Sequence, residues 1–107
     1  MRKGAIIALL LLIAANAMAQ KPVFTITIRD HLFYPAELEV PANTKIKLFI
    51  VNEDATPEEF ESYELNREKV ILGGSKTVIF VGPLKAGVYP FFGEFNMSTA
   101  QGKLIAR

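Results

Sequence analysis

The stretch that decides the fold lies near the C-terminus, where residues 89–106 read YPFFGEFNMSTAQGKLIA. Its first part, Tyr89–Phe92, is aromatic, and its last part is apolar again from Leu104. Between them lies a short polar loop that contains Asn96 and Met97. An aromatic strand, a tight polar loop and a closing strand together predict a β-hairpin.

The segments before this hairpin alternate apolar and polar residues with a period of two, which is typical of half-buried strands. They lie at residues 24–28, 38–40, 46–50, 68–72 and 77–81. Turn-forming residues separate them, and we expect a break in the chain at residues 30–35, where Pro35 cannot donate to a ladder. The pattern predicts about seven short strands and no helix, hence an all-β, single-domain Greek-key β-sandwich.

The segment Glu53–Glu64 differs in kind, because it holds six acidic residues and no basic one. A helix beginning at Pro57 is one interpretation, since proline and acidic residues suit the first turn of a helix. We favour a loop that leads into a short strand, with Phe60 and Tyr63 as its apolar anchors. In an extended segment Glu59 and Glu61 share one face and Phe60 points into the core.

The first 19 residues resemble a secretory signal peptide rather than part of the domain. Arg2 and Lys3 give a positive start, Ala5–Ala15 is an unbroken apolar run, and Ala17–Ala19 is a small-residue cleavage signature. The run is shorter than the ~20 apolar residues of a membrane span. We therefore expect cleavage after Ala19, a periplasmic location, and a soluble domain over residues 20–107.

Composition excludes several classes of function. Without residues 1–19, ten of the twelve Lys and Arg remain against all eleven Asp and Glu, so the net charge falls from +1 to about −1. That balance argues against nucleic-acid binding. The chain has no Cys and one His, so it lacks the thiolate and two imidazoles of a type-one blue copper site. The sequence contains no nucleophile motif of the kind that would predict an enzyme.

Four pieces of the sequence occur in an order that resembles the cupredoxin-like domains, especially the EfeO-type group found with bacterial iron-uptake systems. These pieces are residues 33–44, 51–61, 87–93 and 102–105. Copper-binding relatives carry His, Cys, His and Met where this chain has Glu58, Gly93, Asn96 and, near the last position, Ala100. The EfeO-type loop carries a glutamate followed two residues later by another, which matches Glu59 and Glu61.

Five residues are the candidate metal ligands: Glu59, Glu58, Glu61, Met97 and His31. Carboxylates are hard ligands that suit iron, and they accept copper(II) with nitrogen partners, whereas a thioether favours copper(I). Each candidate has an ordinary interpretation as well. The glutamates form a solvated acidic loop, Met97 plugs the loop tip, and His31 is an exposed turn residue. Glu94, in the hairpin, is either a further ligand or a surface ion-pair partner.

The resemblance implies an exported accessory protein of a bacterial iron transport system, with a transition metal ion, iron or copper, as its cofactor. It implies an iron permease or a periplasmic iron-binding protein as partner, and either delivery or assisted oxidation of ferrous iron as the task. The alternative is a metal-free interaction module, in which the acidic loop and the aromatic hairpin dock on a transport partner.

Overall fold

The computed structural model describes residues 21–107, and the predicted signal peptide, residues 1–19, lies outside that part. Within it no helix is long and apolar enough to cross a membrane. The described chain forms nine strands and one short 3-10 helix. Their bounds are β1 Val23–Arg29, β2 Leu32–Tyr34, β3 Glu37–Val40, β4 Ile46–Asn52, β5 Glu58–Ser62, β6 Arg67–Ile71, β7 Lys76–Val81, β8 Gly87–Gly93, η1 Glu94–Asn96 and β9 Gln101–Ala106.

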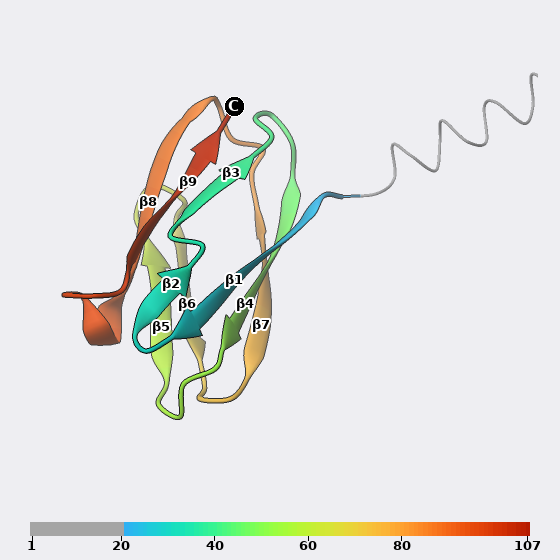
Figure 1. Ribbon diagram of the computed structural model, residues 1–107. Coiled ribbons are helices and arrows are strands. Elements are labelled where there is room, and N and C mark those ends of the chain that lie inside the picture. Colours follow the sequence, from blue (N-terminus) through green and yellow to red (C-terminus); the bar gives the residue numbers. More distant parts are fainter. Residues whose placement is uncertain (1–20) are drawn as a thin grey trace, which may run out of the picture.

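The strands form two sheets that pack face to face, so the predicted all-β sandwich is confirmed (Figure 1). One sheet has four strands in the order β2-β1-β4-β7, and the other has five in the order β3-β9-β8-β5-β6. The consecutive strands β2 and β3 belong to different sheets, so the chain changes sheet around Pro35. Parallel pairs β1–β4 and β3–β9 join segments that are distant in sequence.

The core lies between the sheets and is built by alternation along the strands. In β4, Ile46, Leu48 and Ile50 are buried, as their period of two predicts. Phe60 and Phe91 come from neighbouring strands of the five-stranded sheet, and their ring centroids lie 4.9 Å apart. Phe33 of the opposite sheet meets the Phe91 ring edge-on at 5.0 Å. These three aromatic side chains fill the core near the β8–β9 hairpin and hold the two sheets together there.

The acidic segment forms a strand, not a helix that begins at Pro57. Strand β5 spans Glu58–Ser62 and so begins two residues before Phe60. Glu58, Phe60 and Ser62 are buried, whereas Glu59 and Glu61 lie on the outer face of the sheet. The strand therefore separates its glutamates onto two faces: one points inward and two point outward.

Two sequence expectations were wrong. Tyr63 is no core anchor, because β5 ends at Ser62 and the Tyr63 side chain is 75% exposed in the turn that follows. Leu65 fills the core there instead. The expected break at residues 30–35 is only a turn at Asp30 and His31, both with positive φ. After it, β2 pairs with β1 at the edge of the sheet and ends before Pro35, so the proline removes no ladder donor.

Replacing Phe60 by Ala should lower the free energy of unfolding by about 3–5 kcal/mol, because it removes one ring of the buried aromatic trio and leaves a cavity. Urea denaturation followed by fluorescence or circular dichroism measures this change. Tyr63→Ala is the matched control and should cost about 1 kcal/mol or less, since that ring is exposed and lies beside Phe92 on the surface. Equal costs at the two positions would contradict the assignment of the core.

Candidate functional site

Four glutamates meet on the outer face of the five-stranded sheet, and we call them the acidic cluster. One carboxylate oxygen from each lies within 4.8 Å of those of the other three. The four residues are Glu59 and Glu61 of β5, Glu68 of β6 and Glu94 of η1. Glu61 lies directly opposite Glu68 in the antiparallel pair of β5 and β6, so both side chains stand on the same face. The cluster thus combines three different elements.

The cluster is poorly neutralised by the protein itself. The ion pairs between residues 21 and 107 involve other carboxylates, namely those of Glu37, Glu39, Glu53 and Asp54. One oxygen of the cluster, Oε2 of Glu61, is buried and accepts no hydrogen bond within that same range. Like charges directly opposite in a sheet repel one another. The cluster therefore needs protons or a cation to be stable.

Protons are shared within the cluster. The hydrogen bond with Glu94, together with partial burial, raises the pKa of Glu59 to about 8. The same Glu94 hydrogen bond is also the main cause that raises the pKa of Glu61. Conversely, the hydrogen bonds from Glu59 and Glu61 lower the pKa of Glu94. These shifts favour the charged form of Glu94 and the protonated form of Glu59.

Glu58 does not join the acidic cluster, because its side chain points to the other face of β5. It is 1% exposed and accepts three hydrogen bonds. Its Oε1 accepts from the backbone N–H groups of Glu59, at 3.0 Å, and Phe95, at 2.9 Å. Its Oε2 accepts from Nδ2 of Asn96 at 2.7 Å. All the donors come from β5 itself and from η1, so this carboxylate is a structural acceptor.

His31 does not belong to the acidic cluster, and Met97 lies next to η1, the element that carries Glu94. His31 sits in the β1–β2 turn, where its Nδ1 lies 3.5 Å from Oδ2 of Asp54. Its carbonyl oxygen accepts a hydrogen bond from the Thr99 hydroxyl at 2.8 Å, so the turn contacts the β8–β9 loop. Met97 directly follows η1, its side chain is 54% exposed, and its carbonyl accepts from Gln101. Of the five candidate ligands, the structure brings Glu59 and Glu61 together.

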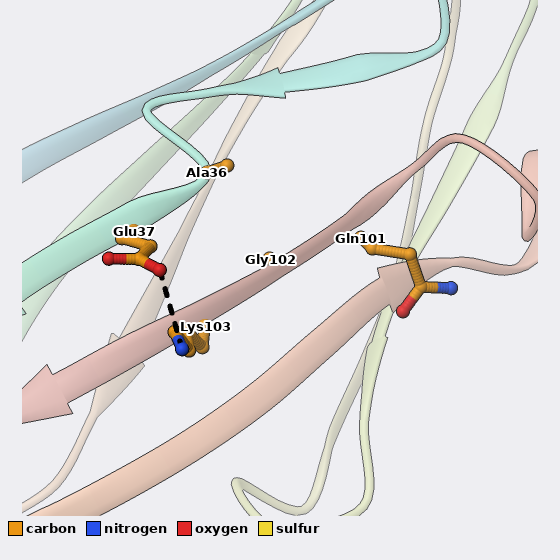
Figure 2. Close-up of a pocket in the computed structure, with 5 residues that line it drawn as sticks. All are labelled: Ala36, Glu37, Gln101, Gly102 and Lys103. Atoms are coloured by element: carbon orange, nitrogen blue, oxygen red, sulfur yellow. Dashed lines mark ion pairs between the residues drawn. The ribbon is translucent and has the colours of Figure 1, made fainter.

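A hollow of about 250 Å³ lies elsewhere, beside β3 and β9. Figure 2 shows its lining, in which Gly102 leaves the β9 surface bare between Gln101 and Lys103. Lys103 pairs across it with Glu37, with Nζ 3.3 Å from Oε1. Lys103 and Glu37 pair with each other, and the Gln101 amide donates to the Met97 carbonyl, so the hollow offers no convergent set of ligands or catalytic groups.

The sequence pattern that defines the Cupredoxin-like domain matches residues 3–106. This chain belongs to the cupredoxin-like family. The uncharacterized protein RP394 of Rickettsia prowazekii (strain Madrid E) is 51% identical over 80 residues, which make up 75% of this chain and 64% of that protein. This cupredoxin-like chain thus spans somewhat less than two thirds of the length of that relative.

Solved structures of copper proteins share the fold of this cupredoxin-like chain. Auracyanin A, a blue copper protein of Chloroflexus aurantiacus, superposes with a TM-score of 0.70 at 13% identity, covering 82% of this chain and all of that one. Amicyanin of Paracoccus versutus gives 0.61 at 17% identity, covering 83% of each chain. At such identities the likeness shows the fold alone.

A blue copper centre does not fit this member of the family, because the chain has no cysteine to supply the thiolate. The four positions that the resemblance aligned with copper ligands nevertheless converge. A Cβ placed on Gly93 would lie 2.6 Å from Cδ of Glu58 and 2.7 Å from Cβ of Ala100. Asn96 donates to the same Glu58 carboxylate. A carboxylate and an amide therefore fill this part of the interior.

Glu68 is the member of the acidic cluster that the sequence interpretation missed. Glu68 is separated from Glu61 by a turn, and only the register of β5 against β6 shows that they are opposite. The signal that could have found it is the pair of short strands around the turn at residues 63–66, since a hairpin of that length fixes the partner of each residue. Glu94 was weighed as a ligand in the hairpin, and it lies in the cluster.

We expect the stability of the protein to fall as the pH rises from the ordinary carboxyl pKa of 4.5 to about 8, because the folded state holds a proton on Glu59 that the unfolded chain releases. The lowered pKa of Glu94 acts only below 4.5 and does not offset this loss. Thermal melts at pH 5 and at pH 9 measure the difference, because these values lie near the start of this interval and about one unit above its end. Glu59→Gln, which mimics the protonated form, should reduce it.

The exposed Glu64, outside the cluster, supplies the control variant Glu64→Gln. This variant should keep the wild-type dependence on pH. If Glu59→Gln and wild type lose the same stability over this interval, the shared proton does not reside on Glu59.

Gly93→Ala should lower the free energy of unfolding by about 1–3 kcal/mol, because the added methyl group would overlap Glu58 and Ala100 in a filled interior. Gly87→Ala in the same strand is the control. Its Cβ would meet nothing closer than a Tyr89 ring carbon at 3.7 Å, so the change should be neutral or slightly stabilising. Chemical denaturation of both variants measures these changes. If Gly93→Ala leaves the free energy of unfolding unchanged, the Glu58 side chain is not held in place.

Proposed function

We propose that this protein is an exported accessory protein of a bacterial iron transport system that binds a transition metal ion, iron or copper, at the acidic cluster. Three observations support the proposal: the cupredoxin-like family, the four converging carboxylates, and the absence of cysteine, which excludes blue copper. Oxygen ligands of this kind suit hard cations, among which iron is the one that fits the resemblance to iron-uptake proteins.

The observation that carries the proposal is the buried Oε2 of Glu61. Among the described residues it accepts no hydrogen bond, although it belongs to a carboxylate in a group of four. A buried acceptor without a partner costs about 1–3 kcal/mol. A bound cation would satisfy this oxygen and offset the repulsion among the four side chains at the same time.

Within the proposed site, Glu59 and Glu61 are the central ligands, and Glu68 and Glu94 complete the set. Glu58 is not a ligand, because both of its oxygens already accept hydrogen bonds in the interior. The proposed setting is the periplasm, and the proposed partner is an iron permease or a periplasmic iron-binding protein. There the protein would deliver iron or assist the oxidation of ferrous iron, which would need an electron acceptor as a second partner.

Calorimetric titration of the purified protein with ferrous ion, under anaerobic conditions, and separately with cupric ion tests the proposal. Wild type should bind with measurable heat and gain thermal stability, whereas Glu59→Gln and Glu61→Gln should each lose tenfold or more in affinity, which is about 1.4 kcal/mol. A cation held by four carboxylates loses a charged ligand in either variant.

Glu64→Gln is the matched control, since Glu64 lies in the same acidic segment but outside the acidic cluster. It should bind as wild type does. Absence of heat and of a thermal shift at millimolar metal would end the proposal. Equal losses in all three variants would show a diffuse charge effect in place of a site.

An interaction module without metal is the second candidate, and exposed apolar side chains favour it. Phe95 is 53% exposed, and it directly follows Glu94 of the cluster; Met97 is similarly exposed two residues later. Interfaces are enriched in aromatic residues and methionine. Co-purification of an iron permease or its periplasmic partner in the presence of a chelator favours this candidate. Partner binding that needs metal favours the first.

A further inference from the structure

Glu58 is the one carboxylate with a fully buried side chain in the part of the chain that the structure describes. Burial of a charged group is costly unless donors surround it. Here the donors are three N–H groups, and no Lys or Arg of residues 21–107 forms an ion pair with it. An apolar side chain at this position would leave these three donors without an acceptor, so the carboxylate acts through its hydrogen bonds.

The two bonds to Oε1 connect the backbones of two members of the acidic cluster. One donor is the N–H of Glu59 itself. The other is the N–H of Phe95, which belongs to the peptide group that follows Glu94. A single oxygen atom therefore joins the peptide groups beside Glu59 and Glu94, although the two residues lie 35 positions apart in the sequence. The side chains of both then project onto the outer face of the sheet and meet there.

The backbone pairing between β5 and the strand that precedes η1 is short. The ladder between β5 and β8 consists of two register pairs, Phe60 with Gly93 and Glu61 with Phe92. Beyond Gly93 the chain leaves the sheet, and η1 lies in contact with β5 (Figure 1). None of the three residues of η1 is buried, and no side chain caps its start. Apolar packing therefore does not hold η1, whereas the Glu58 carboxylate bonds to two of its three residues.

We propose that Glu58 is the positioning residue of the acidic cluster: its buried carboxylate fastens η1 to the start of β5 and thereby sets Glu94 beside Glu59. This inference rests on the proposed metal-binding function. It assigns Glu58 to the construction of the site and not to contact with the ion. Position 58 requires a side chain that is long enough to reach η1 and that ends in an acceptor oxygen. The negative charge of the carboxylate is less important.

Two variants separate reach from charge. Glu58→Asp keeps the charge but shortens the side chain by one methylene group, so it cannot hold Phe95 and Asn96 together. Glu58→Gln removes the charge but keeps the length. Its carbonyl oxygen can accept from the two backbone N–H groups, and its amide can donate to Asn96 once the Asn96 amide turns over. Glu58→Asp should therefore disrupt the cluster more than Glu58→Gln does.

Amide hydrogen exchange, measured by NMR on the metal-free protein, reports the position of η1. Glu58→Asp should speed exchange at the Phe95 amide about tenfold or more relative to the amides of β4, whereas Glu58→Gln should leave it near the wild-type rate. Calorimetric titration with ferrous and cupric ion should follow the same order, with tenfold or greater loss of affinity for Glu58→Asp and retention for Glu58→Gln.

Ser62→Ala controls for simple destabilisation. Ser62 is buried on the same face of β5, but its hydroxyl bonds to Pro90 and Leu65, away from η1. This variant should melt at a lower temperature while metal affinity and relative exchange at Phe95 stay unchanged. If Ser62→Ala lowers affinity as Glu58→Asp does, Glu58 acts only through overall stability and the inference is overturned.

The remaining outcomes also support or overturn the inference. Unchanged exchange at Phe95 in Glu58→Asp overturns the inference, and so does a loss of affinity in Glu58→Gln that equals or exceeds that of Glu58→Asp, because charge would then matter more than reach. If wild type binds neither metal, the proposed function fails. In that case faster exchange at Phe95 in Glu58→Asp alone still supports the role of Glu58 in placing Glu94.

Discussion

The hydrogen bond from Phe95 to the buried Glu58 carboxylate is the constraint on which the arrangement of the site depends. The β8–β9 loop leaves the sheet after Gly93, and its 3-10 helix buries no side chain of its own. Where the loop lies is therefore decided by polar contacts, among them those to Glu58 and the bond from the Thr99 hydroxyl to the His31 carbonyl. Because those contacts are buried, each is stronger than it would be in water, and loss of one partner leaves the others unsatisfied.

Because side chains alternate between the two faces of a strand, adjacent glutamates have different roles. Glu58 faces the interior and accepts hydrogen bonds from backbone N–H groups, whereas Glu59 faces outward and belongs to a group of four carboxylates. A shift of one residue in the register of β5 would exchange these roles and place two acidic side chains in the core. The ring of Phe60, packed against Phe91 and Phe33, prevents such a shift. The aromatic core thus fixes which carboxylate is buried.

The sequence allowed prediction of the sandwich, of Phe60 in the core, and of Glu59 and Glu61 on one face, since each follows from the local period of two. The inclusion of Glu68 could not be predicted, because it depends on the register between β5 and β6. Tyr63 was misplaced because composition does not show where a strand ends. The role of Glu58 was equally hidden, since its donors lie 37 and 38 residues further along the chain.

The electrostatics of the cluster favour a cation over a purely apolar partner. Four carboxylates within 4.8 Å cannot all ionise without a compensating charge. For this reason the pKa of Glu59 is raised to about 8, and its carboxyl group keeps a proton at neutral pH. An apolar surface placed over the cluster would make ionisation of these carboxylates still more costly, because it would remove the remaining water. In the proposed function, a metal ion would displace the proton and would satisfy the buried Glu61 oxygen as well. A docking partner could replace it only by inserting a cationic group at the same point, which would again make the acidic cluster the centre of recognition.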